Sequence, residues 1–285
     1  ASFQAFCRAS MSEDAASAAT RNWALVACTF SKSGSNFCWK MVDVCGVLRS
    51  FVRLFMRVTS LVVVNHSTVN DDELSAFVNA LGVQLQRDAC PAWGRYVLPW
   101  VARADAKLIS ADSWRLNLWD DPPTYEGLLG RHATAGKDFV PTGHVYVNLC
   151  QANKFPWTAV ASHEALEMLG NEGLNLDVAR WRNDGVMELW PRELCDAVQG
   201  VLYDVNGVKM SDFVLPEYFH EGADGPFDFC RALSKPFAIH ASGYSSVLEV
   251  KDGMAKRKNL FGAACPDWKR TLVGSRRQSH WKHIT

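Results

Sequence analysis

The run from Ser162 to Asn171 restricts the fold of this chain most, because it places ionisable side chains inside a strongly apolar segment. On an α-helix, residues i and i+4 lie on one face, so the imidazole of His163 and the carboxylate of Glu167 can hold one metal ion together. Glu164 lies about 100° further round the helix, at the flank of such an ion. A carboxylate at that position can take a proton from a water molecule. The pattern therefore predicts a buried helix that carries a metal site.

The residues around this pattern favour burial over a chance match on a solvated helix face. The apolar neighbours are Trp157, Val160, Ala161, Leu166, Met168 and Leu169. Buried carboxylates and imidazoles need a partner such as a cation. Pro156 suits the first turn of a helix, and Gly170 suits its end. We therefore expect a helix over residues 156–170.

Further metal ligands are expected downstream, in the segment from Glu188 to Asp196. Glu193 is the preferred third ligand, and Asp196 is expected at the same site, where it would orient His163 through its other ring nitrogen. Cys195 can ligate a soft metal, but its apolar neighbours favour a buried structural thiol. One histidine with two carboxylates is a harder ligand set than the usual two-histidine site, so it is expected to bind zinc less selectively and to admit manganese, iron or calcium.

The pattern of the middle of the chain predicts an α+β fold with a mixed sheet. Strands are expected at residues 61–65, 114–119 and 143–149, and a helix at 71–87. After the motif helix, Asn206-Gly207 predicts the turn of a hairpin that begins near Tyr203.

Composition describes an ordinary globular chain, with 48% hydrophobic residues and a formal net charge of zero. No global field therefore directs the chain to nucleic acid or to a membrane. The nine cysteines form no C-x-x-C pair, which argues against a zinc ribbon and against a complete disulfide framework. The first 30 residues lack a clean apolar block, so no signal peptide is expected. These features favour a reducing, cytoplasmic compartment during folding.

Residues 1–58 and 251–285 are expected to be extensions of a central domain over residues 59–250. In the first extension, Arg49, Arg53 and Arg57 line one face of a helix predicted over residues 41–58. A half-buried helix, a helix docked on a neighbouring subunit and a membrane-surface helix all fit this pattern. A transmembrane span is not expected, because the arginines lie at the centre of the segment.

The second extension is basic and contains Trp268 and Trp281. Such a tail can contact nucleic acid. A solvated tail or a contact with protein subunits of a larger assembly is the favoured interpretation.

Several segments resemble a family of zincin-like proteins encoded by phages and bacteria. They are Ser162-His-Glu-Ala-Leu-Glu-Met168, Glu193-Leu-Cys-Asp196, Tyr203, Ser211-Asp-Phe-Val-Leu-Pro-Glu-Tyr-Phe219 and, upstream, residues 59–65, 91–94, 130–132 and 143. The resemblance covers about residues 59–245 and implies a zincin-type fold with a metal at His163 and Glu167. It also draws attention to His132, which can hydrogen-bond a substrate or an oxyanion. In the zincin layout, the strand before the helix, here residues 143–149, can pair with an extended substrate.

The chain departs from the family pattern at Asn171, where an Asp is expected. If that Asp is a ligand or a charge partner in relatives, metal binding is weaker here.

Two functions remain open. In the first, the chain is an H-E-x-x-E zinc metallopeptidase that uses metal-activated water, with Glu164 as base and His132 as a further catalytic residue. In the second, it is a catalytically silent zincin-fold component of a phage particle, located in the virion, whose extensions contact other subunits. Its metal is then a structural staple or absent.

Overall fold

The computed structural model of this chain describes residues 58–102, 109–123, 127–135, 139–267 and 269–270. The chain divides into two compact units, Ala1–Arg49 and Ser50–Thr285, and every described residue belongs to the second. The basic helix expected over residues 41–58 lies outside the described residues apart from Val58, as do residues 271–285 of the basic extension.

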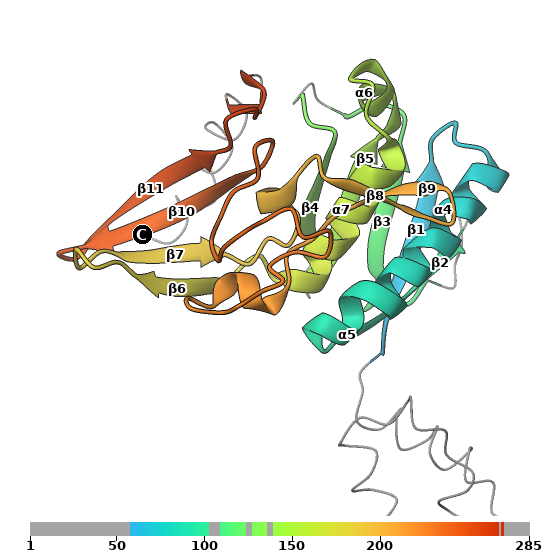
Figure 1. The fold of residues 1–285 in the computed structure, drawn as a ribbon. Helices are drawn as coiled ribbons and strands as arrows, with labels where there is room; N and C mark the ends of the chain where they lie inside the picture. The colour runs from blue at the N-terminus through green and yellow to red at the C-terminus, as the bar shows by residue number, and fades with distance from the viewer. Residues whose placement is uncertain (1–57, 103–108, 124–126, 136–138, 268, 271–285) are drawn as a thin grey trace, which may run out of the picture. The chain divides into compact units, whose positions relative to one another are not determined.

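The first sheet has five strands in the order β2-β1-β3-β5-β4 (Figure 1). These are β1 (Val58–His66), β2 (Tyr96–Ala102), β3 (Trp114–Trp119), β4 (Gly130–Ala135) and β5 (Val140–Tyr146). β1 pairs in parallel with β2 and with β3, and β3 pairs in parallel with β5. β4 pairs antiparallel with β5. The predicted α+β fold with a mixed sheet is therefore confirmed. The predicted strand at residues 61–65 lies within β1, and the one at 114–119 coincides with β3.

The helix expected over residues 71–87 is confirmed as α4 (Asp71–Val83) and continues beyond Val83 in another form. The side chain of Asn70 accepts a hydrogen bond from the backbone N–H of Glu73 at 2.9 Å and so caps the helix. The chain then passes through the π-helix η1 (Gln84–Ala89) into the short helix α5 (Cys90–Trp93). The loss of α-helical spacing at residue 84 was not foreseen from the sequence.

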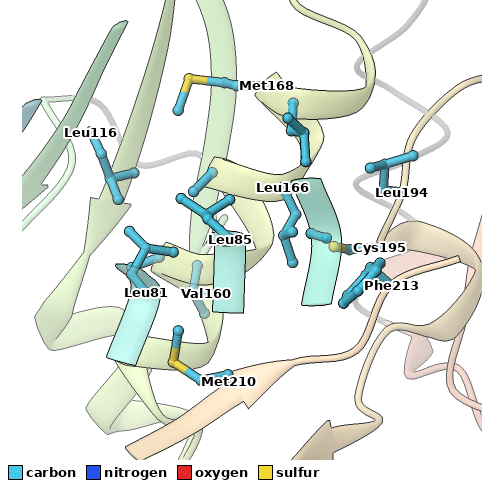
Figure 2. Close-up of a cluster of buried hydrophobic side chains, with 14 of the residues drawn as sticks. Leu81, Leu85, Leu116, Val160, Leu166, Met168, Leu194, Cys195, Met210 and Phe213 are labelled. Carbon is cyan, nitrogen blue, oxygen red and sulfur yellow. The ribbon is translucent and has the colours of Figure 1, made fainter. Parts of the chain in front are cut away.

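The motif helix is confirmed as α7 (Trp157–Gly170), one residue shorter than expected. Except for His163, every residue from Ala159 to Gly170 is buried. Figure 2 shows Val160, Leu166 and Met168 of this helix among buried side chains from other elements, including Leu116 of β3. A helix enclosed in this way can keep polar side chains only where they find partners.

The strand expected over residues 143–149 was wrong for its last three residues. Val147–Ala152 form the helix α6. The pairing of β5 with β3 ends at Tyr146 opposite Trp119, and the next backbone N–H groups have no strand beside them. The N–H of Asn148 donates instead to the carbonyl of Asp120 at 3.0 Å, which turns the chain out of the sheet.

The expectation that this strand pairs with substrate was also wrong, because β5 lies between β3 and β4 and both its edges are occupied. Within the described residues, the sheet edge on this side belongs to β4.

The second sheet is antiparallel and four-stranded, in the order β11-β10-β7-β6. It contains β6 (Asp177–Trp181), β7 (Met187–Pro191), β10 (Tyr244–Lys251) and β11 (Met254–Phe261). The expected domain boundary after residue 250 falls inside β10, so residues 251–261 pair in the same sheet as the residues before them.

The remaining elements are β8 (Leu202–Val205), β9 (Val208–Ser211) and the 3-10 turns η2 (Asp196–Val198) and η3 (Pro216–Phe219). The predicted hairpin is confirmed as β8–β9. Asn206 and Gly207 both have positive φ, 52° and 81°, as a tight hairpin turn requires. Among the described residues, no helix is both long and apolar enough to cross a membrane.

Candidate metal centre

The position of α7 depends on two glycines in the neighbouring strands. A Cβ atom on Gly130 of β4 would lie 2.6 Å from Val160 and 2.7 Å from Oε1 of Glu164. A Cβ atom on Gly143 of β5 would lie 2.7 Å from a methyl of Leu116. The absence of these atoms lets the helix approach the sheet closely. The carboxylate of Glu164 consequently lies against the backbone of β4.

His132 projects from β4 into a group of acidic side chains. Its Nδ1 lies 3.3 Å from Oε2 of Glu167 and 3.6 Å from Oε2 of Glu164. Its Nε2 lies 3.5 Å from Oε2 of Glu193 and makes no hydrogen bond within the described part of the chain. The imidazole is therefore part of the acidic cluster, whereas we expected it from the sequence only as a hydrogen-bonding partner of a substrate or an oxyanion.

His163 approaches the same cluster from the first half of α7. Its Nε2 lies 3.4 Å from Oε1 of Glu167 and 3.6 Å from Oδ1 of Asp196. Asp196 was expected at the other ring nitrogen of His163. The structure instead places both carboxylates at Nε2, because Asp196 begins the turn η2 on the same side of the ring as Glu167.

The carboxylate of Glu167 connects the two histidines. Its Oε1 also accepts a hydrogen bond from the backbone N–H of Cys195 at 3.2 Å. Two sets of possible ligand atoms lie within 4.8 Å of one another, and Glu167 belongs to both. One set is His132, Glu167 and Glu193, and the other is His163, Glu167 and Cys195.

Cys195 is the weaker of these candidate ligands. It is fully buried, and burial, followed by the charge of Glu167, raises the pKa of its thiol well above the ordinary value. Metals bind the thiolate, so a raised pKa disfavours ligation. Its backbone N–H fixes Glu167, which agrees with the structural role that the sequence favoured.

Asn171 supports the site where the family pattern led us to expect Asp. It is buried after the end of α7, and its Oδ1 accepts a hydrogen bond from the N–H of Leu176 at 3.0 Å. Its Nδ2 lies 3.5 Å from Oε1 of Glu193. The amide thus faces Glu193 without adding a further negative charge to the cluster.

The cluster concentrates negative charge away from water. Glu164, Glu167, Glu193 and Asp196 are all buried. Burial, and then the charges of Glu193 and Asp196, raise the pKa of Glu167 well above its usual value. Burial alone would lower the pKa of His132, but Glu193 and Glu164 raise it above its ordinary value. The site therefore favours positive charge, which protons or a cation can supply.

A pocket opens beside the cluster on the side of β4. Glu164 and His163 line it, together with Gly130, Ser211 and the apolar side chains of Leu129 and Phe155. Glu164 therefore belongs both to the buried cluster and to the wall of a pocket. Glu193 and Asp196 are not among the residues that line it.

Other segments of the family pattern hold the surrounding structure together. The backbone N–H of Ser211 donates to Oγ of Ser162 at 2.8 Å, which joins β9 to α7. Asp212 and Asp228 are both fully buried, and Oδ1 of Asp212 accepts a hydrogen bond from the N–H of Cys230 at 3.0 Å. Asp212 and Asp228 do not line the pocket, whereas Ser211 both joins β9 to α7 and lines it.

The structure thus brings together all six residues that the sequence singled out: Glu164, His132, His163, Glu167, Glu193 and Asp196. Sequence reasoning missed Lys269, which also lines the pocket. Its neighbours in sequence gave only the signal of a basic tail.

No family model, curated protein or solved structure matches this chain.

Proposed function

We propose that this chain is a zincin-like, metal-dependent peptidase. The observation that carries the proposal is that Glu164 lies at both places: its carboxylate is 3.6 Å from His132 of the metal-ligand cluster, and it also lines the adjacent pocket. A general base needs this access to water and substrate. The antiparallel edge strand β4, beside a helix with the H-E-x-x-E pattern, supports the zincin-like assignment.

The donor set fits a divalent cation. Imidazole nitrogens and carboxylate oxygens are zinc ligands, and a carboxylate-rich set also admits manganese or iron. We assign Glu167, which both candidate ligand sets share, as a residue that would hold the ion, together with His132 and Glu193 of one set or His163 of the other. Asp196 and Asn171 would position these residues. The buried Nε2 of His132, which makes no hydrogen bond among the described residues, supports its assignment as a ligand. Calcium fits less well, since it favours an all-oxygen set.

When bound, the ion would polarise a carbonyl group and lower the pKa of water. The residues of the chain would transfer the proton and align the substrate. Glu164 accepts the proton of the attacking water and passes it to the leaving amine. The backbone of the edge strand β4 pairs with an extended peptide and aligns its scissile bond with Glu164.

The first experiment is metal analysis of purified protein by mass spectrometry, with Glu167→Gln and Glu217→Gln beside the wild type. Glu217 is exposed and belongs neither to the candidate ligand sets nor to the pocket wall, so its variant controls for loss of a surface charge. We expect about one zinc per chain in the wild type and in Glu217→Gln, and loss of zinc in Glu167→Gln. A peptidase screen follows, with Glu164→Gln as the inactive control.

A zincin-fold structural component of a phage particle is the alternative proposal. Such a component has no need for a base beside an open pocket, so the position of Glu164 favours the peptidase. Absence of metal from the wild type after growth and purification with added zinc would contradict the peptidase and leave this alternative.

A further inference from the structure

The pocket beside Glu164 contains a lysine from near the end of the described chain. Lys269 is the only lysine or arginine among the described residues that line this pocket. Its Nζ lies over the ring of Tyr244, 4.5 Å from the ring centre. Much of the remaining wall is apolar and includes Leu128, Leu129 and Phe155. The pocket therefore combines one ammonium group with an apolar surface, next to the proposed base.

Within the described part of the chain, the ammonium of Lys269 makes no hydrogen bond and no ion pair, and it contacts the ring of Tyr244. Burial lowers its pKa, and the charge of Asp196 opposes this effect. An ammonium that is partly removed from water without an adjacent anion is unfavourable. A ligand with a negative group would supply the missing partner.

Backbone contacts hold the segment that carries Lys269. Arg270 donates from Nη2 to the carbonyl of Gly262 at 3.0 Å and from Nε to the carbonyl of Cys265 at 3.1 Å. The N–H of Gly262 donates to the carbonyl of Gly243 at 2.9 Å. Because these bonds tie the segment to the start of β10, the lysine has a defined position in the pocket.

We propose that Lys269 binds a carboxylate of the substrate, so that the cleft selects peptides with an acidic side chain or a free C-terminal carboxylate at this position. This inference rests on the proposed peptidase function. The adjacent apolar wall would take an apolar residue of the same peptide.

Because the cluster is negatively charged, binding of an acidic substrate should depend on the positive charge of Lys269. Glu164, Glu167 and Asp196 act electrostatically on Lys269, so they also act on a ligand that binds beside it. Without the ammonium, these carboxylates repel an acidic peptide. Replacement of Lys269 should therefore reverse the preference for acidic peptides, and not only weaken binding.

The first test compares matched peptides cleaved by zinc-loaded protein. A pool of peptides from a proteome digest, analysed by mass spectrometry, locates the cleaved bond. Matched substrates then carry Glu or Gln at each flanking position, or a free or amidated C-terminus. We expect the wild type to favour the carboxylate form at one position by about tenfold or more in kcat/KM. Comparison of the Glu and Gln substrates tests for a side-chain carboxylate, and comparison of the free and amidated C-termini tests for a terminal carboxylate.

The variants are Lys269→Met, Lys269→Arg and, as a surface control, Lys256→Met. Lys256 is an exposed residue of β11 and does not line the pocket. We expect Lys269→Met to favour the neutral peptide, and Lys269→Arg and Lys256→Met to keep the wild-type preference. Zinc content and thermal unfolding, measured on each variant, verify that the site and fold are intact. A carboxylate preference that persists in Lys269→Met, or is absent from the wild type, overturns the proposal.

A binding assay separates this proposal from the peptidase proposal. Fluorescein-labelled peptides with Glu or Gln are titrated into zinc-loaded Glu164→Gln protein, with and without Lys269→Met, and fluorescence anisotropy is recorded. If the wild type cleaves nothing, tighter binding of the Glu peptide that depends on Lys269 still supports the carboxylate site, whereas the peptidase fails. Equal binding of both peptides, or no binding, overturns the carboxylate site.

Discussion

Nδ1 of His132 lies 3.3 Å from Oε2 of Glu167, although the two residues come from an edge strand and from a buried helix. The carboxylate of Glu167 thus lies between this imidazole and His163, 3.4 Å away on its other oxygen. This relationship makes His132 a candidate ligand and suggests a direct test.

Replacing His132 by Ala should reduce zinc affinity by about 100-fold or more, because a first ligand matters at least as much as the groups that orient it. Zinc affinity is measured by competition with a chelator of known affinity. His220→Ala, at an exposed position, is the control. If His132 serves only as a donor to the substrate, zinc affinity will stay unchanged and only turnover will fall.

Glu164→Gln should lower kcat by about 10²- to 10⁴-fold and leave zinc content unchanged, since the amide cannot accept the proton of water. Steady-state kinetics on the cleaved peptide and metal analysis of the same preparation provide the comparison. Simultaneous loss of zinc would show that Glu164 is a ligand and not the base.

Asn171→Asp should destabilise the metal-free protein by about 1–3 kcal/mol, because it replaces the amide group that faces Glu193 by a carboxylate oxygen, which repels Glu193. Zinc should restore part of this loss, since the ion offsets the added charge. Urea unfolding with and without zinc measures both effects. Asn183→Asp, at an exposed turn, should change neither curve appreciably. An equal loss in both conditions would mean that Asn171 has no electrostatic connection with the metal site.

The Asp212–Asp228 pair should make stability depend on pH. Burial, and then the hydrogen bond and charge of Asp228, raise the pKa of Asp212 to about 8. The folded chain therefore keeps a proton that the unfolded chain releases near pH 4. Stability is present in full below this range, falls as pH rises from about 4 to about 8, and levels off above, with a slope of up to about 1.4 kcal/mol per pH unit.

Asp212→Asn should remove this part of the slope, because its amide can donate to Asp228 at any pH. Asp228 accepts hydrogen bonds from the backbone N–H groups of Ala232 and Leu233 at 2.7 and 2.8 Å, which hold its carboxylate in place. Urea unfolding between pH 5 and pH 9 measures the slope, with the exposed Asp224→Asn as the control. Parallel curves for the wild type and Asp212→Asn would contradict this account.

The sequence alone determined local structure where the residues that favour helix ends or turns matched the apolar periodicity between them. Helix α7 was predictable because Pro156 and Gly170 mark its ends and its apolar residues indicate burial. The hairpin at Asn206-Gly207 followed from the positive φ angles that these residues tolerate. The placement of His163 and Glu167 on one face followed from the helical repeat alone.

Only the tertiary structure decided how the remaining ligands meet. The bend after Tyr146 depends on where β3 ends, and the insertion of His132 depends on the pairing of β4 with β5 and on the space left by Gly130. The position of Lys269 at the pocket depends on the hydrogen bond from the side chain of Arg270 to the carbonyl of Gly262 and on the backbone hydrogen bond from Gly262 to Gly243. Helical and strand periodicities describe neighbours within one element. Contacts between elements arise from strand order, loop paths and close packing, which no local pattern specifies.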